Sequence, residues 1–203
     1  MFVEVIQGRA SDAEALRAAM DRWTRELAPG ASGWLGSTGG VTDDGRFIAV
    51  ARFESVDAAA HNSQRPEQTR WWEEFERLLD GDITIRDSED VTVDLTGDPE
   101  QAGFVQVMQG RVTDPDRARE LMQQVPSEAM AAYRPDVLGS VQVGHEDGEW
   151  TQVIYFTSET AAREGERTEP PREMQAVMEE MTKLSVGEPA FFDLRRPVLQ
   201  SPG

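Results

Sequence analysis

An internal repeat constrains the fold of this 203-residue chain more than any other feature of its sequence. The segment Phe2–Arg9 returns as Phe104–Arg111 with six of eight residues identical, at a spacing of 102 residues. Phe53–Ser55 returns as Phe156–Ser158 at a spacing of 103. A self-match at so long a spacing indicates two copies of one small domain and not a solenoid of short repeats. The boundaries that it predicts are 1–95 for a first repeat, 96–103 for a linker and 104–203 for a second repeat.

The composition excludes several classes of function. With 38 acidic against 20 basic residues the formal net charge is -18, and such a chain repels phosphate backbones, so we expect no nucleic-acid partner. The absence of cysteine excludes disulfides, thiolate metal sites and a cysteine nucleophile. No apolar run reaches the ~20 residues of a membrane span and the N-terminal residues do not resemble a signal peptide. We therefore expect no membrane partner and a cytoplasmic location.

The first part of each repeat reads as a strand, a helix and a hairpin. Phe2–Gln7 is dense in apolar and β-branched residues, which is typical of a strand buried on both faces. Ser11 with Glu14 fits a capping box that begins a helix. The pair Asp44–Gly45 between two apolar runs predicts a tight hairpin turn.

The second part of each repeat reads as a broken helical region and a closing strand. The helical region begins at Ser55, is interrupted at 62–65 and restarts at Pro66, a favourable first-turn residue. Closing strands are predicted at 83–95 and at 190–199.

The second repeat has its own substitutions within the same pattern. Pro126 is expected to end or kink its first helix early. At a spacing of 103, methionines replace the apolar face of the restarted helix, so this face is interpreted as core packing. The expected pairs are Trp71 with Met174, Phe75 with Met178 and Leu78 with Met181.

Each repeat is therefore predicted to be a β-α-β-β-α-β unit of the ferredoxin-like, α+β class, with both helices on one side of an antiparallel sheet. Val3 and Val5 point to the opposite face from Phe2 and Ile6, yet all four are apolar. Helices cover only one face. We therefore expect the two repeats to pack sheet to sheet as one intramolecular barrel.

The stretch Phe53–His61 combines an aromatic residue, a short acidic run, alanines and a histidine. With the first strand and the hairpin, it resembles the dimeric α+β barrel superfamily, and most closely antibiotic-biosynthesis-monooxygenase-like domains. The resemblance covers nearly the whole chain as two fused copies. Members of that family include cofactor-free oxygenases, haem-degrading enzymes, isomerases and proteins of no known activity. The resemblance therefore implies no single reaction for this chain.

The resemblance also implies where a ligand binds. The pocket of similar domains lies between the helices and the sheet of one copy, which implicates five residues as catalytic or substrate-binding. They are Gln7, His61, Asn62, Trp71 and Trp72.

Haem is not expected here. Haem-degrading relatives have asparagine at the position of Gln7, and their ligating histidine lies late in the second helical region, where Glu73–Leu79 contains none. The second histidine, His145, is expected to be a solvated turn residue and is too far from His61 in sequence to form a metal motif with it. We expect neither a metal nor a cofactor.

His61 and Asn62 are the candidate catalytic residues, and each has a structural alternative. His61 could exchange a proton near neutral pH, or it could sit at a helix end and donate to a carbonyl. Asn62 could hold an oxyanion, or it could serve only as the residue at which the helix breaks.

The two neighbouring tryptophans are the candidate substrate-binding residues. Trp71 is expected to pack in the core. Trp72 has Gln175 at a spacing of 103, so the fold does not demand an aromatic ring there, and it could line a pocket or an interface.

Two functional hypotheses follow. The first is a cofactor-independent monooxygenase that binds an aromatic or polyketide-like small molecule in the first repeat. The second is a non-catalytic binding or stress-associated protein whose pockets are filled by its own aromatic residues. An open apolar pocket of ~300 Å³ or more beneath His61 would favour the first, and a closed interior with His61 facing solvent would contradict it. The oligomeric state, including a homo-oligomer, is left open.

Overall fold

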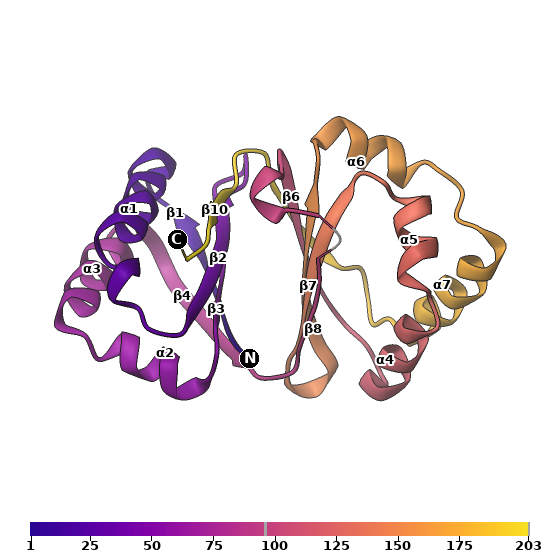
Figure 1. Cartoon of the computed structure of the whole chain (residues 1–203), viewed down its shortest axis with the longest axis horizontal. Helices are drawn as coiled ribbons and strands as arrows, with labels where there is room; N and C mark the ends of the chain where they lie inside the picture. Colours follow the sequence, from indigo (N-terminus) through magenta and orange to yellow (C-terminus); the bar gives the residue numbers. More distant parts are fainter. Residues whose placement is uncertain (96, 203) are drawn as a thin grey trace. The chain divides into compact units, whose positions relative to one another are not determined.

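The computed structural model describes residues 1–95 and 97–202 (Figure 1). The chain divides into two compact units: unit 1 is residues 1–91 with 192–203, and unit 2 is residues 92–191. Thr96 in the predicted linker and Gly203 at the end of the second repeat lie outside the described residues. The repeat boundaries describe the sequence and stay a prediction for the domains.

Unit 1 is built on a five-stranded antiparallel sheet in the order β10-β2-β3-β1-β4, with its helices on one face (Figure 1). Its elements are β1 (Phe2–Ala10), α1 (Ala13–Glu26), η1 (Ala28–Gly30), β2 (Trp34–Val41), β3 (Arg46–Phe53), α2 (Val56–Ser63), α3 (Pro66–Glu76), β4 (Leu79–Ser88) and β10 (Val198–Gln200).

The second sheet has the equivalent order β5-β7-β8-β6-β9. The elements of this part of the chain are β5 (Val91–Asp94), η2 (Pro99–Gln101), β6 (Phe104–Arg111), α4 (Pro115–Gln123), α5 (Ser127–Tyr133), β7 (Val137–Gly144), η3 (Glu146–Gly148), β8 (Glu149–Phe156), α6 (Glu159–Glu166), α7 (Arg172–Leu184) and β9 (Ala190–Leu194). The predicted α+β class with two ferredoxin-like repeats is thus confirmed. Sheet-to-sheet closure of the repeats stays a prediction.

Local sequence signals explain where most helices begin and end. Ser55 caps α2 by accepting from the backbone N–H of Ala58, and Pro66 occupies the first turn of α3, both as predicted. Pro126 separates α4 from α5. The capping box at Ser11 is wrong by one residue. The N-cap is Asp12, whose carboxylate accepts from the N–H groups of Glu14 and Ala15, while the hydroxyl of Ser11 donates to the carbonyl of Leu78.

Each predicted closing strand is two strands in the structure. The segment 83–95 divides into the end of β4 and β5, and 190–199 divides into β9 and the start of β10. In both cases the second piece joins the other sheet. Pro197 lies in the second break, where its missing N–H cannot continue a ladder.

Helix α7 begins three residues later than the 103-residue spacing from α3 predicts. Two residues separate α2 from α3, whereas five separate α6 from α7. The N-cap Arg65 of α3 therefore corresponds to the N-cap Pro171 of α7. At the other end, the N–H of Ser11 donates to Leu78, and that of Thr113 donates to Leu184.

This shift corrects the predicted pairing of the aromatic residues. Trp71 corresponds to Val177 and not to Met174, and Trp72 corresponds to Met178 and not to Gln175. The sequence spacing failed because it carried no signal of the three inserted residues.

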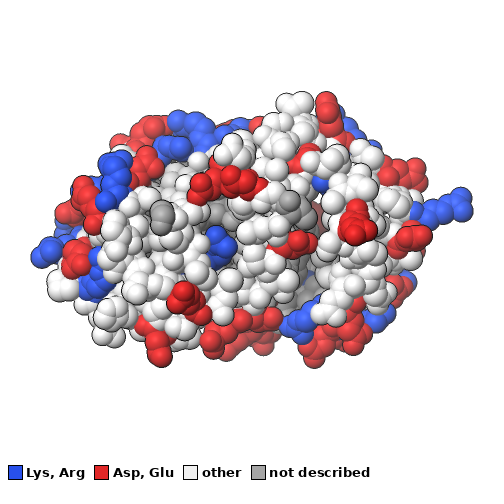
Figure 2. Space-filling model, viewed as in Figure 1, with Lys and Arg blue, Asp and Glu red and all other residues white. Residues whose placement is uncertain are grey.

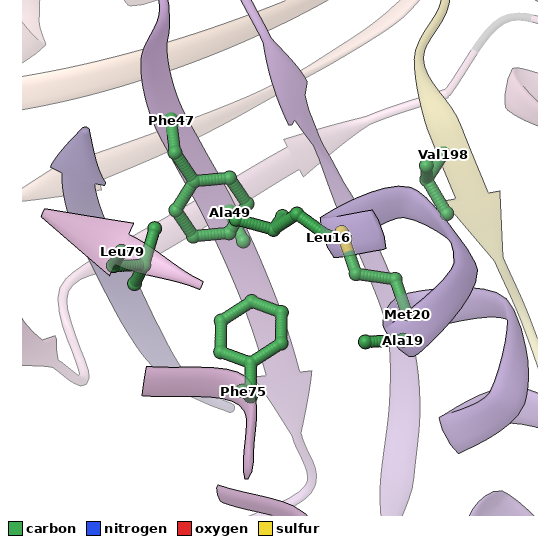
Figure 3. Packing of buried hydrophobic residues seen from close by; sticks show 8 residues of the cluster. All are labelled: Leu16, Ala19, Met20, Phe47, Ala49, Phe75, Leu79 and Val198. Carbon is green, nitrogen blue, oxygen red and sulfur yellow. The ribbon is translucent and has the colours of Figure 1, made fainter. Parts of the chain in front are cut away.

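The core of unit 1 lies between the sheet and the helices α1 and α3 (Figure 3). Its buried members are Leu16, Ala19, Met20, Phe47, Ala49, Phe75, Leu79 and Val198. Because the side chains of a strand alternate, Val3 and Val5 point to the opposite face, and both are fully buried there.

No helix in the described ranges 1–95 and 97–202 combines the length and apolar character needed to cross a bilayer. Acidic side chains are spread over the face shown in Figure 2, with basic ones between them.

Candidate ligand-binding site

A pocket of about 360 Å³ lies between the sheet and the helices of unit 1. All its lining residues belong to unit 1. They are Glu4, Ile6, Met20, Trp23, Trp34, Ser37, Phe47, Ala49, Ala51, Phe53, Asn62, Ser63, Gln68, Thr69, Trp71, Trp72, Phe75, Ile85 and Gln200.

The floor of the pocket is formed by the helix-facing side chains of the sheet. The strand register places Ala51 beside Glu4 of β1 on one side and beside Ser37 of β2 on the other. Ser37 in turn pairs with Gln200 of β10. The small side chain of Ala51, with that of Ala49, leaves space above the middle of the sheet. The floor is therefore apolar and open at its centre, with Glu4 and Gln200 near its two ends.

The wall is a cluster of aromatic rings from α1, β2 and α3. Trp71 stacks on Phe75 with ring centroids 4.6 Å apart, and Trp72 stacks on the same ring at 5.7 Å. Trp23 packs edge-on against Trp34 at 4.9 Å. Offset-stacked and edge-on pairs of this kind stabilise one another beyond the area that they bury.

Hydrogen bonds fix three of the four indoles. The Nε1–H of Trp23 donates to Gln68 (2.6 Å), that of Trp34 to Ser37 (3.0 Å) and that of Trp71 to the carbonyl of Ala19 (3.0 Å). A buried indole N–H left without an acceptor would be costly, so these bonds also favour one orientation of each ring. The orientation of the wall is thus fixed by contacts within unit 1.

Glu4 is the one carboxylate of the pocket lining. Burial, and then the negative charge of Asp87 beside it on β4, raise the pKa of the Glu4 carboxyl from 4.5 to about 7. Within residues 1–95 and 97–202, no hydrogen-bond donor reaches this carboxylate. An acid with such a pKa is half deprotonated near neutral pH, so it can accept a proton and return it.

Asn62 presents an amide to the same pocket. The residue is only 5% exposed, and its Oδ1 accepts from Nη1 of Arg65 at 2.9 Å. Because a guanidinium only donates, this contact assigns the amide oxygen and directs the Nδ2 donors elsewhere. Asn62 can therefore donate to an oxygen atom in the pocket.

The structure brings together three of the five residues expected from the sequence. Asn62, Trp71 and Trp72 line the pocket, and Trp71 is both a packing residue and part of the wall. Whether they bind a substrate stays a prediction.

The other two expected residues lie outside this pocket. On α2 the inward positions are Ala59 and Asn62, so helical periodicity turns His61 into solvent, where it is exposed. On β1, Glu4 and Ile6 line the pocket, so Gln7 points to the other face of the sheet. The expectation that both face the pocket is wrong for these geometric reasons.

His145 also differs from expectation. It is half-buried instead of solvated, and its Nε2 lies 2.9 Å from Oγ1 of Thr151.

Glu4 and Gln200 are pocket residues that sequence reasoning missed. The difference between Glu4 and its counterpart Gln106 in the repeat was a usable signal. Gln200 gave none, because its contribution depends on β10 joining the sheet of unit 1.

Comparison with known proteins supports the fold. No family model and no curated protein matches the sequence. The "putative monooxygenase from Lactobacillus acidophilus NCFM" is 12% identical, with a TM-score of 0.78 over 98% of this chain and 95% of that one. An "anthrone oxidase-like protein" is 15% identical, with a TM-score of 0.68 over 98% and 92% of the two chains.

A single-domain "putative antibiotic biosynthesis monooxygenase from Nitrosomonas europaea" is 15% identical, with a TM-score of 0.37, and covers 43% of this chain and 95% of its own. At identities of 12 and 15%, the full-length likenesses show a shared fold: this chain has the fold of solved structures described as a putative monooxygenase and an anthrone oxidase-like protein.

Proposed function

We propose that unit 1 binds a planar aromatic small molecule and oxygenates it without a cofactor, with Glu4 as the base. The observation that carries this proposal is the apolar pocket of about 360 Å³ with one carboxylate of raised pKa in its lining. Pockets of this size and composition are typical of small-molecule sites.

The shape of the pocket supports a flat ligand. The stacked rings of Trp71 and Phe75 lie on the helix side, and the small side chains of Ala49 and Ala51 lie on the sheet side. A planar molecule between them would gain stacking on one face and bury apolar area on the other.

The chemistry begins with a proton transfer. Glu4 would take a proton from an acidic carbon of the ligand, and the raised pKa matches this step to neutral pH. An amide N–H of Asn62 would donate to the oxygen on which the negative charge of the resulting enolate collects. Dioxygen then oxidises the carbanion, and the overall change at a methylene is R₂CH₂ + O₂ → R₂C=O + H₂O.

The fold supports this class of reaction only as an analogy, because neighbours described as monooxygenases share the fold and little of the sequence. Glu4 replaces His61 in the proposal, since His61 is exposed and outside the pocket.

The test has two steps. Thermal-shift screening with phenols, quinones, anthrones and haem should show stabilisation by planar phenols or anthrones, because a ligand that binds only the folded state raises its stability. An oxygen electrode then measures O₂ uptake with each ligand that binds. Uptake that requires Glu4 supports the oxygenase, whereas binding without uptake favours the non-catalytic alternative, and no binding contradicts both.

A further inference from the structure

The chain's last strand supplies a polar group to the pocket of unit 1. In β10, Val198 and Gln200 both point toward the helices, because alternate residues of a strand share a face. Val198 belongs to the core cluster and lies near α1 (Figure 3). Gln200 lines the pocket and is only 8% exposed.

One hydrogen bond fixes the orientation of the Gln200 amide. Its Nε2 donates to the backbone carbonyl of Met20 in α1 at 2.8 Å. Since a carbonyl only accepts, the nitrogen must face Met20 and the carbonyl oxygen Oε1 must point away from it. Within residues 1–95 and 97–202, this is the one hydrogen bond of the Gln200 side chain.

Oε1 of Gln200 is not among the described side-chain atoms that are fully buried without a hydrogen-bond partner, so it is not sealed inside the protein. This oxygen keeps access to the pocket that Gln200 lines. Oε1 of Gln200 is therefore placed as an acceptor for a group that enters the pocket.

The position of Gln200 defines the length of the ligand. Strand pairing gives the order Glu4, Ala51, Ser37 and Gln200 across four neighbouring strands. Three steps of about 4.8 Å separate the backbones of the first and last of these residues by roughly 14 Å. The space between their side chains suits a molecule of two to three fused rings.

We propose that Gln200 determines specificity by accepting a hydrogen bond from a hydroxyl group at the end of the ligand distant from Glu4. This inference rests on the proposed binding function of the pocket. It adds that the ligand is a fused-ring phenol, whose hydroxyl is recognised by the C-terminal strand, and not any aromatic molecule of suitable size.

The test compares two probes of similar shape. 1-Naphthol can donate a hydrogen bond and 1-methoxynaphthalene cannot. The wild-type protein should bind 1-naphthol about tenfold more tightly, as expected for one buried hydrogen bond. In Gln200→Met, which keeps the length of the side chain, this preference should disappear while the affinity for 1-methoxynaphthalene is retained. Leu199→Ala, on the opposite face of β10, is the matched control and should keep the preference.

Three results contradict the inference in distinguishable ways. Equal affinity of the wild-type protein for both probes overturns the role of Gln200 alone. Equal loss of both probes in a folded Gln200→Met variant shows a merely structural residue. Failure of the wild-type protein to bind either probe removes the binding function itself.

A spectroscopic readout remains if the variant does not fold. In wild-type protein labelled with [¹⁵N]glutamine, 1-naphthol should shift the side-chain amide resonance of Gln200, and 1-methoxynaphthalene should shift it much less. Equal shifts with both probes would overturn the inference.

Discussion

The two sheets of this chain have equivalent strand orders but differ in what their central strands, β3 and β8, present to the helices. In unit 1, β3 presents Ala49 and Ala51, which line the pocket. At the same register in β8 stand Gln152 and Ile154, and Ile154 packs against the buried cluster of Phe104, Phe156 and Ala162. The small side chain of Ala51 therefore leaves a space above the sheet that Ile154 fills in the other repeat.

The chemistry of the two copies differs at the neighbouring strand. Glu4 pairs with Ala51, whereas Gln106, at the equivalent place, pairs with Ile154 and cannot ionise. The aromatic wall is likewise confined to unit 1, because Trp34 and Trp71 correspond to Val137 and Val177. In a duplicated chain, the shared residues thus serve the fold, and the differences locate the candidate site.

The largest effect on activity is expected when Glu4 is replaced by glutamine, the residue that unit 2 has at the equivalent position, Gln106. Glu4→Gln removes the proposed base and should lower kcat/KM for O₂ uptake by about 10²- to 10⁴-fold, the usual contribution of general base catalysis. The affinity for 1-naphthol should change little, because the two side chains have nearly the same shape. Activity of the variant within tenfold of the wild-type value would exclude Glu4 as the base.

Glu4 should also make stability depend on pH in a defined direction. Its pKa is about 7 in the folded protein and 4.5 without burial, so the folded state holds a proton that the unfolded chain has lost. Stability should therefore fall as pH rises from about 4.5 through about 7, by ~3 kcal/mol at most. Urea unfolding at a series of pH values measures this loss, and Glu4→Gln should remove it. An unchanged pH dependence in the variant would show that Glu4 is not buried as described.

A larger side chain on the floor of the pocket tests whether the difference between Ala51 and Ile154 explains the pocket of unit 1. Ala51→Ile installs the residue of β8 and should weaken ligand binding at least about tenfold by occupying the space above the sheet. Ile154→Ala is the reciprocal control and should cost about 2 kcal/mol of stability without affecting binding. Isothermal titration and urea unfolding measure the two effects. Unimpaired binding by a folded Ala51→Ile variant would place the ligand elsewhere.

The smallest effect is expected at the exposed histidine. His61→Ala should leave kcat/KM within about twofold, since the imidazole lies outside the pocket. Glu164→Ala changes the equivalent exposed position in unit 2 and serves as the control. A loss of activity confined to His61→Ala would restore the histidine as the base and refute the assignment of Glu4.

Much of the fold could be predicted from the sequence because its signals are local. The signals are the dense apolar run of β1, the turn at Asp44–Gly45 and the proline breaks, and each depends on near neighbours along the chain. The exchange of β5 and β10 between sheets could not be predicted, because strand pairing joins residues that are distant in sequence. Gln200 was missed for the same reason.

The resemblance predicted pocket-lining residues correctly where the periodicity of the helix or strand also turns them inward. It failed where the periodicity turns them away from the pocket. Asn62, Trp71 and Trp72 share the inner side of α2 and α3, so they were found together. His61 lies 100° around the helix from Asn62, and Gln7 lies on the opposite face of the strand from Glu4. A motif conveys which residues are near one another, and only the period of the element conveys which of them point inward.

A ligand-bound crystal structure tests the central claim most directly. The fused-ring phenol with the largest thermal shift would be soaked into crystals of the wild-type protein. We predict electron density in unit 1 between the Trp71–Phe75 stack and Ala51, with one end within hydrogen-bonding distance of Gln200 and the other beside Glu4. Density for the ligand in unit 2 with an empty pocket in unit 1 would contradict the account.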